Sequence, residues 1–254
     1  MKTTMRNILK KTALHSSIAI MALGLTLTSC KKDENNNNNN NNNNDPSSSI
    51  QFGDGTLVAV RSETVQSTPF GDVTITLGTG IAAFSNSSNY SSLADAGNVS
   101  LNSESLQKQS NNSYVFTPGV ANPTGIDFSG GINWSVAGNS ASGVPAFTHT
   151  VSHGFPNAGN ITSGDEVSKG AGFTITISNI SNADSVYFLI NDKLKSFAGN
   201  VTTASFSAAD LSGLSKGQGI ITVAPWKFST AQYGGKNFYF VTETVKQKSV
   251  TIVD

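Results

Sequence analysis

Short runs of alternating apolar and polar residues, separated by turn-forming residues, dominate the chain from residue 50 onwards. Residues 73–77 place Val73, Ile75 and Leu77 on one face of a half-buried strand, and residues 173–177 repeat the pattern. The continuously apolar run 186–190 predicts a strand buried on both faces. No window after residue 30 keeps a helical periodicity beyond about two turns. The sequence therefore predicts an all-β fold with one or two antiparallel β-sandwich domains.

A domain boundary is expected between Phe155 and Val167, where the chain lacks apolar content. It divides the chain into an N-terminal β-sandwich domain, residues 50–156, and a C-terminal one, residues 160–254. Each half is long enough for about seven strands. One long sandwich is the alternative.

The C-terminal half resembles an immunoglobulin-like sandwich of the kind found in bacterial surface proteins. The likeness rests on residues 172–178 and 185–191 as core strands, and on residues 206–214 as a strand that passes into a one-turn crossing before residues 219–226. The tyrosine corner and the inter-sheet disulfide of antibody domains are both missing. The resemblance implies a shared architecture rather than membership of the antibody family.

The N-terminus has the features of a secretory signal. Four basic residues and an apolar run from Ile18 to Leu27 precede the small pair Thr28-Ser29. The apolar run would span about 15 Å as a helix, half of the roughly 30 Å hydrocarbon layer. We expect residues 1–29 to be a signal peptide rather than a permanent transmembrane helix.

Leu27-Thr28-Ser29-Cys30 resembles a bacterial lipobox. The resemblance implies cleavage after Ser29 and fatty acylation, such as palmitate, at Cys30. The following Lys32-Asp33-Glu34 is similar to the export signal of Bacteroidota-type surface lipoproteins, which implies a lipid anchor in the outer membrane with the protein facing the cell exterior. A solvated charged tether and a plain signal peptide with an incidental cysteine are the alternatives. Cys30 is the only cysteine, so it has no disulfide partner in the chain.

Residues 30–49 contain ten consecutive asparagines, from Asn35 to Asn44. A polar tract of this kind has nothing to bury, which predicts a disordered tether. As a flexible coil it would hold the β-region about 25 Å from the membrane.

Charge argues against nucleic acid as a partner. The first 29 residues carry four of the 16 Lys and Arg and none of the 16 Asp and Glu, so residues 30–254 have a net charge of −4. A mildly acidic chain without basic clusters lacks the electrostatic footprint of a nucleic-acid-binding protein.

The residues that carry chemistry form no recognisable catalytic or metal-binding motif. His149 and His153 have the spacing of a helical zinc motif, but on a strand their rings lie about 13 Å apart. Acids considered for glycoside hydrolysis all stand in turn-like contexts, where Asp commonly bonds its own backbone; they are Asp54, Asp72, Asp127, Asp165 and Glu166. We predict a protein that is not an enzyme and that binds no metal or cofactor, with a glycoside hydrolase as the weakest alternative.

Aromatic residues give the one positive indication of a binding site. Trp226 and Phe228 lead into the Tyr233-Gly234-Gly235 turn, a run that looks loop-like and would let these rings stack on sugars. Core packing is the competing interpretation for Trp226, and it is favoured for Trp134, which lies between Ile132 and Val136. Asp184-Ser185-Val186 also resembles a bacterial O-glycosylation acceptor, with Ser185 as the modified residue.

These observations predict a lipid-anchored surface protein that acts by binding or adhesion, with a glycan or another surface protein as its ligand. The alternative is a structural or accessory lipoprotein that packs into an envelope complex. The sequence leaves the oligomeric state open.

Overall fold

The computed structural model of the protein describes residues 53–68, 71–85 and 92–254. The expected signal peptide, tether and Cys30 lie outside these residues. The fold is all-β and sandwich-like, as the sequence predicts. In chain order its elements are β1 (Gly55–Thr68), β2 (Gly71–Phe84), β3 (Val99–Leu101), β4 (Glu104–Ser105), β5 (Gln107–Lys108), β6 (Tyr114–Phe116), β7 (Asn133–Val136), the 3-10 helix η1 (Ser140–Ser142), β8 (Phe147–Thr150), β9 (Asn157–Ala158), β10 (Glu166–Ser168), β11 (Phe173–Thr176), β12 (Ile180–Ser181), β13 (Ser185–Ile190), β14 (Lys193–Ala198), β15 (Thr203–Phe206), α2 (Ala208–Leu211), β16 (Gly217–Tyr233) and β17 (Lys236–Val253).

A large sheet organises the described chain. Its strand order is β14-β13-β16-β17-β1-β2-β6-β5, and β10 also pairs with β17. Most neighbours are antiparallel, but β1 and β10 each pair with β17 in parallel, which the sequence pattern does not reveal. Strands from both expected halves of the chain therefore share one sheet. That residues 50–156 and 160–254 are separate domains stays a prediction.

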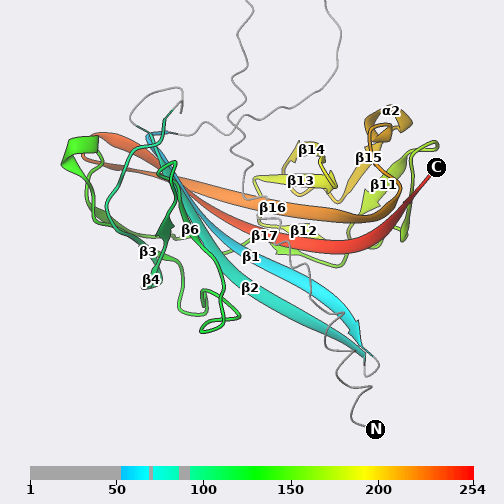
Figure 1. The fold of residues 1–254 in the computed structure, drawn as a ribbon, viewed down its shortest axis with the longest axis horizontal. Helices are drawn as coiled ribbons and strands as arrows, with labels where there is room; N and C mark the ends of the chain where they lie inside the picture. The colour runs from blue at the N-terminus through cyan, green and yellow to red at the C-terminus, as the bar shows by residue number, and fades with distance from the viewer. Residues whose placement is uncertain (1–52, 69–70, 86–91) are drawn as a thin grey trace, which may run out of the picture. The chain divides into compact units, whose positions relative to one another are not determined.

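The β16–β17 hairpin supplies the two longest strands of this sheet (Figure 1). Tyr233 pairs with Lys236, so the loop has two residues, Gly234 and Gly235, with φ of 56° and 76°. A two-residue loop with positive φ at both positions matches the twist of the strands it joins, and glycine adopts that conformation at little cost. The Gly-Gly turn thus fixes the register of the hairpin.

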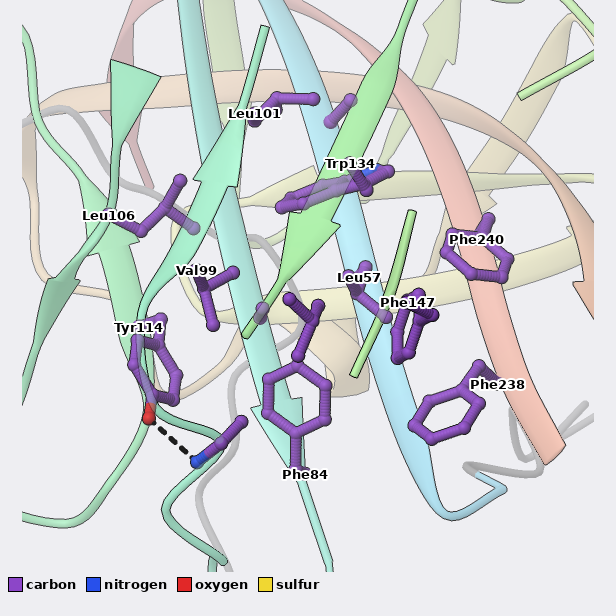
Figure 2. Close-up of a cluster of buried hydrophobic side chains, with 14 of the residues drawn as sticks. Leu57, Phe84, Val99, Leu101, Leu106, Tyr114, Trp134, Phe147, Phe238 and Phe240 are labelled. Carbon is purple, nitrogen blue, oxygen red and sulfur yellow. Dashed lines mark hydrogen bonds between the residues drawn. The ribbon is translucent and has the colours of Figure 1, made fainter. Parts of the chain in front are cut away.

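Two hydrophobic clusters lie on one face of the large sheet. In the first, side chains of β1, β2 and β17 pack against the four-stranded sheet β4-β3-β7-β8, with Leu57, Phe84, Trp134 and Phe238 fully buried (Figure 2). Trp134 is 1% exposed, which confirms its predicted place in a core. Tyr114 is buried here too, and its hydroxyl accepts a hydrogen bond from the Ala96 N–H at 2.8 Å.

The second cluster forms toward the C-terminal end of β17. Buried residues of β13, β16 and β17 pack against β11, β15 and α2, and include Phe188, Val223, Ile252, Phe206 and Leu211. The predicted passage from a strand into a one-turn crossing is present as β15 followed by α2, which Ser207 and Asp210 cap reciprocally. Whether this half has immunoglobulin-like topology stays a prediction.

The segment expected to contain a domain boundary is hydrogen-bonded to the large sheet. Thr242 and Thr244 donate hydrogen bonds to the carbonyl oxygens of Gly154 and Pro156, and Lys248 Nζ donates to the carbonyl of Ser163. Part of the segment is strand β9, which pairs with β12. Polar side chains of β17 between the two clusters therefore hold the connection against the sheet.

The expectation of half-burial for residues 73–77 is wrong, although the strand is present. Val73, Ile75 and Leu77 share a face of β2, but Val73 is 50% and Ile75 38% exposed. The alternating pattern predicts which side chains share a face of the strand, whereas the burial of those side chains depends on whether another layer covers that face. These residues belong to the side of the sheet described next.

Candidate binding face

The registers of the large sheet define two faces. The core face carries Phe238, Phe240, Val250 and Ile252 of β17, all of which belong to the hydrophobic clusters. The opposite side, here the back face, carries the intervening residues, which include Tyr239, Val241, Glu243 and Val245. Neither cluster contains a residue of the back face on β17.

Unbroken pairing extends the back face across six strands. The row that contains Glu243 consists of Thr79, Val60, Glu243, Trp226, Ser185 and Ala198 on β2, β1, β17, β16, β13 and β14. The neighbouring row toward the hairpin turn consists of Ile81, Val58, Val241 and Phe228. Val58, Val60, Val241 and Val245 are all less than 10% exposed, so the middle of the face is both apolar and buried.

A chain of aromatic rings crosses the back face. Ring centroids lie 5.8 Å apart for Tyr187–Trp226, 6.0 Å for Trp226–Phe228 and 5.7 Å for Phe228–Tyr239. These spacings are those of favourable aromatic pairs. Trp226 is buried, whereas Phe228 is 40% exposed. The rings therefore run from the buried middle of the face to a surface that another molecule can reach.

Exposed hydrophobic residues concentrate on the same face. Among the described residues, six large hydrophobic side chains are exposed. Val120 lies in a turn, and the registers place the other five on the back face: Val73, Ile75, Leu194, Ile220 and Phe228. Single exposed hydrophobic residues are ordinary, but a concentration on one face marks an interaction surface.

Glu243 is the only residue with a charged side chain that the registers place on the back face of these six strands, within the described residues. It is 3% exposed, and burial raises the pKa of its carboxyl to about 8. Burial, followed by the charge of Glu243, also raises the pKa of Tyr187 to about 12. The carboxyl is thus largely protonated at neutral pH.

The predicted binding residues separate between the two faces. Trp226 and Phe228 lie together on the back face, but in the middle of β16, so the expectation of a loop at this point is wrong. Tyr233 lies on the core face, where its ring stacks on Phe147 at 4.4 Å and its hydroxyl lies 2.9 Å from His149 Nδ1. Ser185 is 4% exposed at the start of β13, and its glycosylation stays a prediction.

His149 and His153 have different surroundings in the structure. His149 is on β8, with its ring 3.6 Å from that of Phe240, and burial followed by the charge of His153 lowers its pKa. His153 lies beyond the end of β8, with Nδ1 3.2 Å from Thr242 Oγ1. Within the described residues, no three His, Cys, Asp or Glu side chains are grouped to hold a metal ion.

Several acids weighed for hydrolysis bond nearby backbone or a lysine. Asp54 accepts from the Asn237 N–H and Asp127 from the Ser129 N–H, both at 2.8 Å, and Asp165 pairs with Lys248 at 2.7 Å. Glu166 is exposed on β10, and the side chain of Asp72 lies outside the described part. Sequence reasoning missed Glu243, although a single acid within the apolar run of residues 238–245 was a usable signal.

A polar groove of about 920 Å³ lies on the outer side of the four-stranded sheet. Its lining includes Ser100, Asn102, Asp127, Asn133, Ser135 and Thr148. Trp134 also borders it, but its side chain is buried in the first cluster and presents no ring to the groove. The groove offers hydrogen bonds without an aromatic stacking surface.

Comparison with known proteins gives no relative: no protein family, curated protein or solved structure matches this chain. No helix among residues 53–68, 71–85 and 92–254 is long and apolar enough to span a membrane.

Proposed function

We propose that this protein is a lipid-anchored binding protein of the outer membrane that faces the cell exterior and docks another protein on its back face. The anchor is the acylated Cys30, and the polar tether keeps the β-region within reach of envelope partners. The observation that carries the proposal is the concentration of five exposed hydrophobic side chains on one sheet face.

Binding rather than catalysis is the activity we propose. Three of the five acids considered for hydrolysis have structural roles, since Asp54 and Asp127 accept backbone N–H bonds and Asp165 pairs with a lysine. Among the described residues, Glu243 is the one acid that the registers place on the back face, whereas glycoside hydrolysis requires two carboxyl groups at a defined separation.

A protein suits the back face better than a glycan. Sugar recognition combines a stacked ring with several hydrogen bonds at its edges, but the row beside Phe228, which is the exposed ring, consists of the aliphatic residues Ile81, Val58 and Val241. Aliphatic and aromatic side chains together are typical of the buried centre of a protein interface. A structural or accessory lipoprotein would use the same face, and its complex would differ from that of a binding protein only in its lifetime. The back face is therefore the feature to test first.

Site-specific photocrosslinking on intact cells tests the face. A photoreactive phenylalanine analogue replaces Phe228 on the back face or, as the matched control, Val120, which is fully exposed away from the sheet. We expect a discrete protein adduct from position 228 and none from position 120. Equal crosslinking from both positions would reject the back face as a docking surface.

A glycan array run with the parent protein and Phe228→Ser provides the opposing test. Glycan binding that disappears in this variant would show that the ligand of the back face is a sugar and not a protein.

A further inference from the structure

The first half of β2 has no neighbour on the side away from β1. β1 pairs with the whole of β2, but β6 pairs only with residues 80–82, and a bridge joins Gly78 to Gly125. No strand in the part of the chain that the structure describes pairs with residues 71–77 on this side. Unpaired N–H and C=O groups at the edge of a sheet are a template for another strand.

The side chains of this segment are exposed on both faces of the sheet. Val73 is 50% and Ile75 38% exposed on the back face, and Thr74 and Thr76 are exposed on the core face. β17 pairs with β1 up to Thr64, and beyond it β1 and β2 continue as a two-stranded ribbon (Figure 1). A ribbon of two strands is marginally stable in water, so a third strand would stabilise it.

The composition of the segment is that of an edge open to pairing. Residues 73–76 are all β-branched, which favours an extended strand, and residues 71–77 contain no lysine, arginine or proline. The opposite edge of the large sheet is β14, which carries Lys193 and Lys195. Lysine on an edge strand is a usual protection against pairing. The sheet is thus protected at β14 and open at β2.

The pairing of Gly78 shows which backbone groups face the open edge. Its N–H donates to the carbonyl of Thr124 at 2.9 Å, on the side away from β1. In an antiparallel ladder the backbone groups of alternate residues point to the same side. Asp72, Thr74 and Thr76 therefore each present one N–H and one C=O to the open edge.

We propose that this edge pairs with the same edge of a second copy of the chain, in an antiparallel register centred on Thr74, and so joins two large sheets into one. The register places Thr74 opposite Thr74 of the other copy, and Thr76 opposite its Asp72. All three residues that face the edge then exchange N–H and C=O groups, which gives about six hydrogen bonds. The inference goes beyond the proposed function, since it does not depend on what docks on the back face.

A second copy suits the edge because the segment is complementary to itself. In this register Val73 lies opposite Ile75 of the other copy, and β-branched pairs directly across two strands stabilise a sheet. No like charges meet within residues 71–77, because Asp72 is the one charged residue and lies opposite Thr76. Pairing of two identical antiparallel strands is two-fold symmetric, so the assembly closes as a dimer.

Disulfide crosslinking on intact cells tests the register, and the parent protein, with Cys30 as its one cysteine, gives the background. Thr74→Cys is the test variant, and Val73→Cys and Ile75→Cys are the matched controls. Position 74 would have Cα atoms of the two copies about 5.5 Å apart, within the range of a disulfide, whereas positions 73 and 75 would have them about 8 Å apart. We expect oxidation with copper–phenanthroline to give about tenfold more covalent dimer at position 74 than at either control. Equal yields at the three positions, or no dimer at position 74, would overturn the inference.

Proline tests whether the dimer forms through the backbone. In the Thr74→Cys protein, Thr76→Pro removes an N–H that faces the open edge and leaves the hydrogen bonds to β1 in place. It should lower the yield of dimer about tenfold, because one hydrogen bond is lost from each copy. Thr76→Val keeps the N–H and should leave the yield unchanged. Equal yields from these two variants would reject pairing through the strand edge.

The crosslinks at positions 74 and 228 report on different strands, so this inference and the proposed function can fail separately. A protein adduct from position 228 without a dimer at position 74 means that the protein docks its partner as a monomer, which rejects the edge pairing. A dimer at position 74 without an adduct from position 228 supports the edge pairing and rejects docking on the back face.

Discussion

The buried carboxyl of Glu243 predicts a specific dependence of stability on pH. Burial raises its pKa from 4.5 to about 8 in the folded protein, whereas the unfolded chain keeps the ordinary value. Between these values the folded state holds a proton that the unfolded state has released. Stability associated with Glu243 is therefore complete below about pH 4.5 and declines as the pH rises toward 8.

The size of the decline follows from the difference in pKa. At about 1.36 kcal/mol for each unit, the change from 4.5 to about 8 corresponds to about 5 kcal/mol. This is a large fraction of the 5–15 kcal/mol that stabilises a typical domain. Because the side chain is 3% exposed, solvent screening reduces the figure little.

Glu243→Gln tests this reasoning, because it removes the titrating group and keeps the shape. Urea unfolding of both proteins, followed by tryptophan fluorescence, gives the free energy of unfolding at each pH. We expect the variant to be more stable than the parent by several kcal/mol at about pH 9, with the advantage disappearing near pH 4. Glu63→Gln, which removes a carboxylate paired with Lys246, should show no advantage at high pH. A Glu243→Gln advantage that is absent, or equal at both pH values, would refute a buried and unpaired carboxyl.

Three further outcomes follow from other contacts. Tyr114→Phe leaves the Ala96 N–H without its buried acceptor and should lower the free energy of unfolding by about 1–3 kcal/mol, measured by urea titration. Burial lowers the pKa of His149, so its contribution to stability is complete above pH 6.5 and is lost as the pH falls through the folded-state value; a His149→Gln variant should lose less stability between pH 7 and pH 5 than the parent. Cys30→Ala should move the protein from the membrane fraction to the soluble fraction, and continued sedimentation with membranes would contradict the lipid anchor.

Local patterns predicted the strands well. The alternation at residues 173–177 and the apolar run at 186–190 correspond to β11 and β13, and the turn at Gly234-Gly235 closes the longest hairpin. These features depend on neighbours in sequence, where side-chain period and turn conformation decide the outcome. Fold class could be predicted from the sequence for that reason.

Local sequence patterns could not predict which distant strands pair with each other. The parallel register of β1 with β17 joins residues about 180 positions apart, and nothing in either strand specifies its partner. The same limit explains the loop expected at Trp226 and Phe228. The expectation rested on the nearby Tyr233-Gly234-Gly235 turn, yet β13 pairs with β16 at Trp226 and keeps this part of the chain extended.

The candidate site emerges where sequence pattern and burial disagree. The alternation of residues 73–77 is typical of a strand that a second layer covers on one face, yet Val73 and Ile75 are exposed. Glu243, in contrast, is a charged residue type that is buried without an ion pair among the described residues. Natural sequences mostly agree with their folds at every level, and conflicts concentrate at functional sites. A docked protein would resolve the first conflict, because its apolar side chains would cover Val73 and Ile75 of β2. Each of these two features alone is compatible with a purely structural role, but their presence on the same face of the same sheet favours a binding surface.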